Sequence, residues 1–243
     1  MKTYRILFLS LLVGSFLLMG CANNPSDATA QGTDKEAKAE GAAQGEQKKS
    51  DPAAKKEEGA TPASAGQGDK LKVEFYVMSQ CPYGTQVEDA VKPVLEKIGS
   101  HVDFHLDYIV TPDGKGGFSA MHGQSEVDGN IWQLCSIDQY GENYKYMEFL
   151  LCMNKQMRQI PNNAEACATQ VGFDAAKLKE CATGQKGKDL LAASAEKAKA
   201  RGATGSPTIY MANQKYSGGR STDEFMRSFC GAMKGTKPQP CLE

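Results

Sequence analysis

A cysteine lies where a predicted strand passes into a predicted helix. Residues 71–78 (Leu-Lys-Val-Glu-Phe-Tyr-Val-Met) alternate apolar and polar side chains, which is typical of a strand, and Pro82 is favoured as the first residue of a helix. Cys81 is therefore expected at the N-terminal end of that helix, where unpaired N–H groups and the helix dipole stabilise a thiolate. The position predicts a reactive nucleophile, and the plain alternative is a buried structural cysteine or one that forms a disulfide elsewhere.

A second segment, residues 203–209 (Ala-Thr-Gly-Ser-Pro-Thr-Ile), places a proline at the start of another predicted strand. Together with the Cys-Pro-Tyr turn, this segment resembles DsbA-like thioredoxin-fold proteins over about residues 70–235. The resemblance implies that Pro207 is a cis-proline packed against Cys81. It also implies that Pro207 and the backbone of Ser206 position a partner chain.

The chain departs from that family at the fourth position of its motif, which is Cys-Pro-Tyr-Gly instead of Cys-x-x-Cys. The resemblance implies that Pro82 and Tyr83 shape the start of the helix, and Gly84 is expected to leave room where the second sulfur normally lies. Without a second cysteine, a mixed disulfide is not resolved within the motif. Three alternatives remain: Cys81 acts as a monothiol resolved by an outside thiol, another cysteine of this chain resolves it, or the site has lost catalysis and kept binding.

The order of the predicted elements agrees with this resemblance. Helical spacing over 82–99, followed by alternation over 101–110, predicts a strand, helix, strand unit with a parallel pair. Residues 111–204 then contain several helical stretches. The chain returns to strands at about 207–216 and closes with an amphipathic helix over about 222–233. The expected fold class is α/β, a thioredoxin-like fold with a helical insertion, as in the DsbA-like branch.

The remaining cysteines predict disulfides rather than a metal site. Setting aside Cys21 and Cys81 leaves six, and six cysteines of an exported protein allow three bridges in any of 15 connectivities. Short spacing favours two bridges and leaves the third: Cys152–Cys167, Cys230–Cys241 and Cys135–Cys181. The chain has no Cys-x-x-Cys pair and its three histidines are scattered, so neither a metal nor another cofactor is expected.

The predicted insertion carries a weaker resemblance of its own. Fragments at 121–123 (Met-His-Gly), 132–135 (Trp-Gln-Leu-Cys), 146–155 and 164–167 are similar to the disulfide-bearing helical region of thiol reductases of the GILT type. Their aromatic and methionine side chains are expected in the core. Only the placement of the cysteines in these fragments bears on function.

The N-terminus is typical of an exported lipoprotein. The apolar run from Ile6 to Met19 follows two basic residues and is shorter than the roughly 20 residues of a membrane-spanning helix. It is followed by Gly-Cys, which resembles a bacterial lipobox and implies that residues 1–20 are a signal peptide and Cys21 is lipidated. The alternatives are an ordinary signal peptide or an uncleaved anchor. Ala at position 22 implies an outer-membrane address if the source is Gram-negative.

The segment after this cysteine has no large apolar side chains. Residues 22–69 lack Val, Ile, Leu, Met, Phe, Trp and Tyr, so they have nothing with which to form a core. We interpret 21–69 as a lipidated cysteine with a disordered tether, and 70–243 as one thioredoxin-like domain with its insertion at about 111–204. The chain has 28 Lys and Arg and 29 Asp and Glu, so it carries no excess of positive charge, and no nucleic-acid partner is expected.

The sequence thus predicts a thioredoxin-like protein held by a lipid anchor in the membrane, on the periplasmic side of the outer membrane. Its expected activity is that of a thiol-disulfide oxidoreductase or isomerase of the monothiol type. The expected partners are thiol- or disulfide-containing proteins or small thiols, which form mixed disulfides with Cys81. The alternative function is a redox-silent lipoprotein that holds a peptide or protein in the same groove.

Replacing the predicted acylation site tests the anchor. Cys21→Ser is expected to block lipidation, because the acyl chains attach to that sulfur, and to leave the protein soluble or unprocessed. Membrane fractionation and the intact mass of the mature chain measure this. An unchanged mass and unchanged membrane association would contradict the lipoprotein interpretation.

Overall fold

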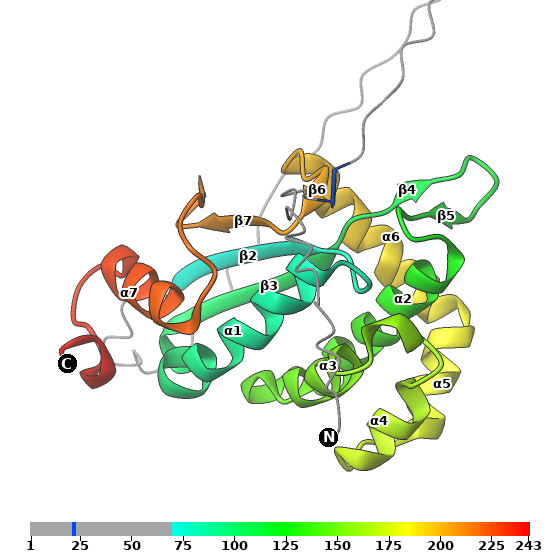
Figure 1. Cartoon of the computed structure of the whole chain (residues 1–243), viewed down its shortest axis with the longest axis horizontal. Coiled ribbons are helices and arrows are strands. Elements are labelled where there is room, and N and C mark those ends of the chain that lie inside the picture. Colours follow the sequence, from blue (N-terminus) through cyan, green and yellow to red (C-terminus); the bar gives the residue numbers. More distant parts are fainter. Residues whose placement is uncertain (1–20, 23–69) are drawn as a thin grey trace, which may run out of the picture. The chain divides into compact units, whose positions relative to one another are not determined.

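The computed structural model describes residues 21–22 and 70–243; the predicted signal peptide and tether residues 23–69 lie outside the described residues. A four-stranded sheet with the order β3-β2-β7-β8 forms the centre of the domain (Figure 1). Its strands are β2 (Leu71–Val77), β3 (Val102–Tyr108), β7 (Thr208–Met211) and β8 (Gln214–Lys215). β2 pairs parallel with β3 and antiparallel with β7, and β7 pairs antiparallel with β8. Helix α1 (Pro82–Ile98) connects the parallel pair, as the sequence predicts.

The two faces of β2 pack against different helices, because successive side chains of a strand point to opposite sides. The ring of Phe75 lies 5.1 Å from that of Phe104 and 5.4 Å from that of Phe225, which is on α7 (Thr222–Ala232). Tyr76, the next residue, packs instead in a small cluster with Ala198 of helix α6 (Gln185–Ala200). The sheet is therefore covered on both faces.

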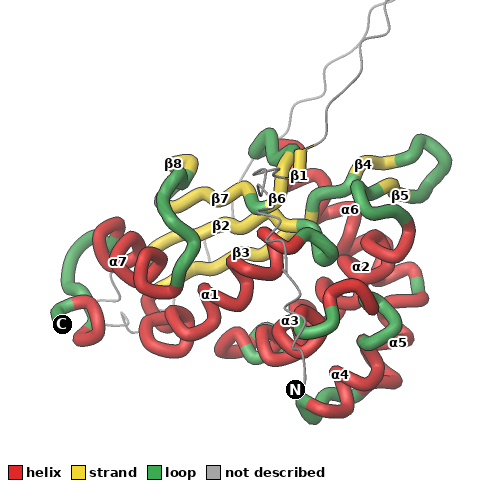
Figure 2. Tube along the Cα trace, in the orientation of Figure 1, coloured by secondary structure: helices red, strands yellow, loops and turns green. Residues whose placement is uncertain are grey.

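The insertion between β3 and β7 is mostly helical, and its helices lie beside the sheet (Figure 2). Its other helices are α2 (Gln124–Gln139), α3 (Tyr146–Asn154), α4 (Ala164–Gln170) and α5 (Ala175–Thr183). Short 3-10 turns occur at η1 (Gly99–His101), η2 (Glu142–Tyr144), η3 (Met157–Gln159) and η4 (Gln239–Cys241). The expected fold class, a thioredoxin-like α/β fold with a helical insertion, is confirmed.

Three disulfides hold the insertion and the C-terminal tail, in the pairing that the spacing favours. Cys135–Cys181 joins α2 to α5, and Cys152–Cys167 joins α3 to α4. Cys230–Cys241 joins α7 to the last 3-10 turn. The central sheet contains none of these bridges, so the cross-links act on the parts of the domain outside it.

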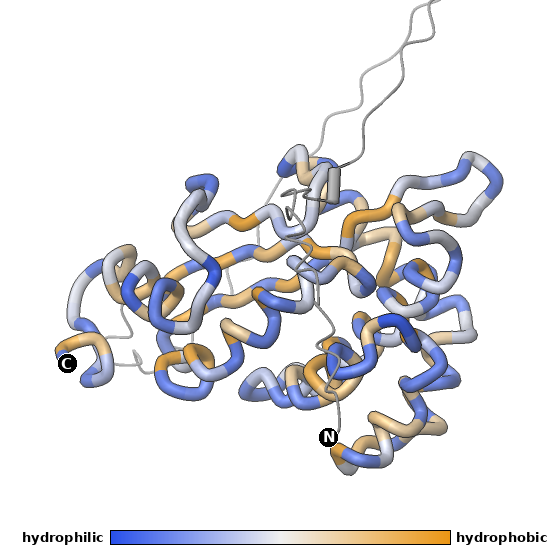
Figure 3. Tube along the Cα trace, viewed as in Figure 1, coloured by the Kyte–Doolittle hydropathy of each residue, from blue (hydrophilic) through white to orange (hydrophobic). Residues whose placement is uncertain are grey.

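Two pairs of short strands lie outside the central sheet. β4 (Thr111–Pro112) and β5 (Phe118–Ser119) form a hairpin whose loop is hydrophilic, whereas apolar residues recur along β2 and β3 (Figure 3). β6 (Gly205–Ser206) pairs antiparallel with β1 (Cys21–Ala22), with Cys21 opposite Ser206. No helix among the described residues is long and apolar enough to cross a bilayer.

A carboxyl group is buried between α1 and α3. Glu88 accepts a hydrogen bond from Asn154 Nδ2 at 2.8 Å, while its Oε1 has no partner among the described residues. The hydroxyl of Tyr108 is also buried and unpartnered in this part of the chain. Burial raises the pKa of Glu88 from its ordinary value of 4.5 to about 8, because the charged form loses its hydration.

Glu88 is expected to make the stability of the domain depend on pH. Between about pH 4.5 and pH 8 the folded chain keeps the Glu88 proton while the unfolded chain releases it, so the free energy of unfolding falls as pH rises through this interval. Glu88→Gln cannot ionise and is expected to flatten that dependence. Urea unfolding at pH 5, 6.5 and 8 measures it.

The matched control is Glu96→Gln, which removes a carboxyl from an exposed position of the same helix. Its pH dependence is expected to follow that of the unaltered protein. Equal slopes for the Glu88 and Glu96 variants would show that Glu88 is not the group responsible.

Candidate functional site

Cys81 lies at the start of α1, where the sequence places it. It is the N-cap residue, with an extended backbone (φ −88°, ψ 122°), and Pro82 is the first helical residue. Its N–H donates to the carbonyl of Met78 at 3.0 Å, and its carbonyl accepts from Thr85 N–H at 3.0 Å. The side chain is fully buried, so a partner sulfur must displace a neighbouring group to reach it.

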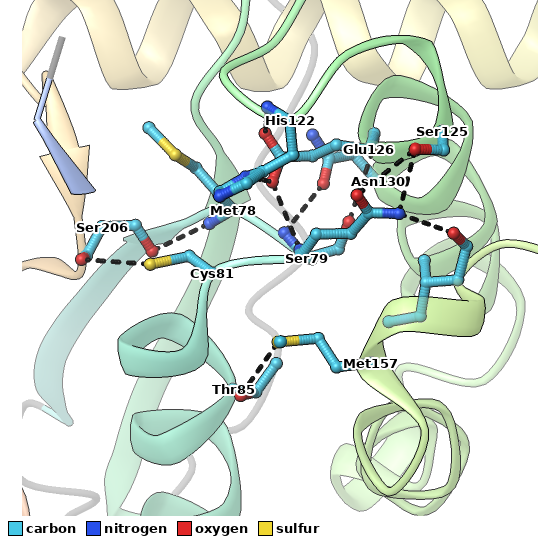
Figure 4. Close-up of polar contacts among 12 residues, drawn as sticks. Met78, Ser79, Cys81, Thr85, His122, Ser125, Glu126, Asn130, Met157 and Ser206 are labelled. Carbon is cyan, nitrogen blue, oxygen red and sulfur yellow. Dashed lines mark hydrogen bonds and ion pairs between the residues drawn. The ribbon is translucent and has the colours of Figure 1, made fainter.

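Ser206 contacts both the nucleophile and the strand that leads to it. The Ser206–Pro207 peptide bond is cis, as the resemblance implies. Cys81 Sγ lies 3.7 Å from the carbonyl oxygen of Ser206, and Ser206 Oγ accepts a hydrogen bond from Met78 N–H at 3.0 Å (Figure 4). Residues 125 positions apart in the chain therefore form one site.

Apolar side chains surround the sulfur. Cys81 belongs to a small buried cluster whose other members are Tyr76, Met78, Ile109, Ala198 and Ala203. Burial, assisted by the nearby carboxylate of Glu74, raises the pKa of Tyr76 well above its ordinary value, so this hydroxyl keeps its proton at neutral pH. On the rim, Pro82 is exposed, and Arg220 lies over the ring of Tyr83 at 5.4 Å.

Gly84 does not leave room for a second sulfur, so this expectation is wrong. The residue is buried, and a Cβ added to it would lie 2.6 Å from Ser206 Oγ and 2.9 Å from the carbonyl oxygen of Met78. Both distances are shorter than real Cβ contacts, and the second involves backbone. The hydroxyl of Ser206 and the backbone of the turn before Cys81 therefore pack directly against Gly84.

The other cysteines of residues 70–243 are all paired in the three disulfides. A resolving thiol from that part of the chain would require one of these bridges to open first. This counts against the alternative in which one of these six cysteines resolves a mixed disulfide on Cys81. Within the same residues, no group of three or more His, Cys, Asp or Glu side chains is arranged to hold a metal ion.

Residues of α2 that the sequence did not single out hold the turn before Cys81. Asn130 Oδ1 accepts from Ser79 N–H at 3.1 Å, and a carboxylate oxygen of Glu126 accepts from Gln80 N–H at 3.3 Å. His122, noted in the sequence only as part of a weak resemblance, lies 2.5 Å from Glu126 through Nδ1. His122 lies in the turn before α2, so the spacing rule for side-chain pairs on a helix gives no signal for this contact.

Adding a methyl group at position 84 tests how closely the site is packed. Gly84→Ala is expected to lower the free energy of unfolding by about 1–3 kcal/mol, because Ser206 or the Met78 backbone must move. Gly231→Ala in α7 is the control, since a Cβ there meets nothing within 4 Å, and it is expected to stabilise by about 0.5–1 kcal/mol. Urea unfolding distinguishes the two, and equal effects would contradict the close packing.

Two protein families match parts of the chain. Residues 72–171 match the family gamma interferon inducible lysosomal thiol reductase (GILT), and residues 142–229 match the DSBA-like thioredoxin domain. A GILT-like protein of Caenorhabditis elegans is 28% identical over 138 residues, which cover 52% of this chain and 42% of that protein. The match thus spans less than half the length of this curated relative.

Solved structures agree with this likeness. The thiol-disulfide oxidoreductase MdbA of Actinomyces oris superposes with a TM-score of 0.54 at 13% identity, covering 67% of this chain and 80% of that one. The disulfide bond oxidoreductase DsbG of Mycobacterium tuberculosis gives 0.51 at 18% identity, covering 70% and 81%. At these identities the likeness shows the fold. The chain has the DsbA-like thioredoxin fold that its motifs predict, and it is similar in sequence to the GILT and DSBA-like families.

Proposed function

We propose that the protein exchanges thiols and disulfides through Cys81 as a monothiol, with an external thiol completing each cycle. The observation that carries the proposal is the approach of Cys81 Sγ to the carbonyl of Ser206, beside the cis bond to Pro207. The sulfur lies at the N-terminal end of α1, directly before its first helical residue, Pro82. The tightly packed Gly84 supplies no second sulfur.

The cycle has two exchanges. The Cys81 thiolate attacks one sulfur of a substrate disulfide, forms a mixed disulfide and releases the other substrate sulfur as a thiolate. An external thiol, as its thiolate, then attacks the substrate sulfur of the mixed disulfide. A new disulfide forms between the substrate and the external thiol, and Cys81 leaves as a thiolate. Each step exchanges one S–S bond for another, so no other oxidant or reductant is needed.

The partner is proposed to bind as an extended chain along Gly205 and Ser206. Support comes from the backbone of Cys21 and Ala22, which pairs antiparallel with these two residues in the structure. This edge therefore accepts a strand beside the reacting sulfur, and main-chain pairing of this kind does not depend on the partner's sequence. Proteins with accessible disulfides fit such a site.

The lipid anchor at Cys21 and a location on the periplasmic side of the outer membrane belong to the same proposal. They rest on the sequence up to and including position 22. The three disulfides of residues 70–243 are consistent with an oxidising compartment, where such bridges persist.

The test is the formation and lifetime of an adduct on Cys81. With oxidised glutathione at neutral pH, the folded protein is expected to gain one glutathione by intact mass, and Cys81→Ser is expected to gain none. The adduct should persist after the reagent is removed and disappear when reduced glutathione is added, because no second cysteine lies in the motif. Failure of Cys81 to react, or spontaneous loss of the adduct, would contradict a monothiol cycle.

The full burial of Cys81 favours one other candidate, a redox-silent lipoprotein that holds a peptide along Gly205 and Ser206. Peptide binding by Cys81→Ser separates the two functions. Unchanged affinity, together with an unreactive Cys81 in the unaltered protein, would favour the binding function.

A further inference from the structure

We propose that Glu126, held by His122, is a positioning residue for Cys81, and that α2 thereby sets the reactivity of the thiol. The inference rests on the proposed function, since it concerns the same sulfur. It assigns a role to a buried carboxylate and a histidine that thiol-disulfide exchange does not itself use.

Glu126 is a fully buried acidic side chain that bonds to the active-site turn on one side and to His122 on the other. Its Oε2 accepts from the backbone N–H of Gln80 at 3.3 Å and lies 2.5 Å from His122 Nδ1. Its Oε1 accepts from the backbone N–H of His122 at 3.4 Å. A buried carboxyl group needs hydrogen-bond partners to offset its lost hydration, and one of its donors belongs to the residue directly before Cys81.

The neighbouring residue of the turn is held from the same helix. Ser79 N–H donates to Asn130 Oδ1, and Ser79 Oγ donates to the carbonyl of Glu126 at 3.4 Å. Gly129 lets α2 approach, because a Cβ there would lie 2.9 Å from Ser79 Oγ. Figure 4 shows these side chains converging on the turn from α2, while Ser206 contacts Cys81 from the opposite side.

The position of the sulfur depends on these hydrogen bonds between α2 and the turn. Cys81 is the next residue after Gln80, and its extended backbone directs the side chain toward the carbonyl of Ser206. If Gln80 N–H loses its acceptor, the turn is free to move, and the thiol shifts relative to both the helix end and Ser206. The rate of a bond-forming step falls steeply when the reacting atoms are displaced by about 1 Å.

The experiment measures the second-order rate of Cys81 with an uncharged aromatic disulfide at neutral pH in the full chain. Glu126→Ala removes the acceptor of Gln80 N–H and is expected to lower the rate about tenfold, the size of effect that one strong hydrogen bond supports. Glu126→Gln keeps an acceptor oxygen of the same reach, and it is expected to restore the rate to within about threefold of that of the unaltered protein.

Asp128→Asn is the matched control, because it makes the same carboxyl-to-amide change on α2 at a side chain that bonds only to Gln124 among the described residues. It is expected to leave the rate unchanged. If Glu126→Ala does not fold, judged by its disulfides and thermal unfolding, Glu126→Asp decides by its rate, which is expected to fall because the shorter side chain draws the carboxyl group away from Gln80 N–H. A folded Glu126→Ala or Glu126→Asp variant with the rate of the unaltered protein would overturn the inference. An unreactive Cys81 in the unaltered protein would instead overturn the proposed function.

Discussion

The site depends on one constraint, that the turn between β2 and α1 is fixed from both sides. From one side Ser206 accepts the N–H of Met78 and places its carbonyl near the sulfur. From the other, Asn130 and Glu126 accept the N–H groups of the next two residues. Three consecutive backbone donors are thus satisfied by side chains from distant parts of the chain. These three hydrogen bonds fix the position of Cys81, which follows directly in the chain.

This arrangement gives the insertion a direct part in the site. In a minimal strand, helix, strand unit nothing on the α2 side would hold the turn, whereas here α2 packs on it through Gly129. The Cys135–Cys181 bridge ties α2 to α5, and α5 in turn contacts α4 and α6. The Cys135–Cys181 disulfide therefore supports the helix that holds the turn before the nucleophile, although this bridge is not part of the central sheet.

The fold and the two segments that form the site, the turn at Cys81 and the Ser206–Pro207 segment, could be predicted from local sequence. Alternation over 71–78 and the placement of Pro82 mark a strand that runs into a helix, and both signals are contained within a few residues. The Ser206–Pro207 segment was found through its resemblance to a family. The disulfides followed from the six cysteines that remain without Cys21 and Cys81, and from their short spacings. These features depend little on tertiary contacts.

What could not be predicted depends on packing between distant segments. The space around Gly84 is decided by Ser206 and by the Met78 carbonyl, neither of which the motif itself specifies. Likewise, Glu126 and Asn130 look like ordinary polar positions of a helix until that helix is placed against the turn. The buried Glu88 gives no signal in the sequence, because its burial and its hydrogen-bond donor depend on α3 as well as on its own helix.

The contact between Gly84 and Ser206 also restricts which sequences are reachable from this one by single changes. A side chain at 84 meets the hydroxyl at 206, while removing that hydroxyl takes away the acceptor of Met78 N–H. Either change made first carries a penalty that the other partly relieves, so the effects of the two are expected to be non-additive. A dithiol site therefore lies at least two coupled substitutions away, and the Met78 carbonyl, which no substitution deletes, makes even the double variant depend on a backbone shift.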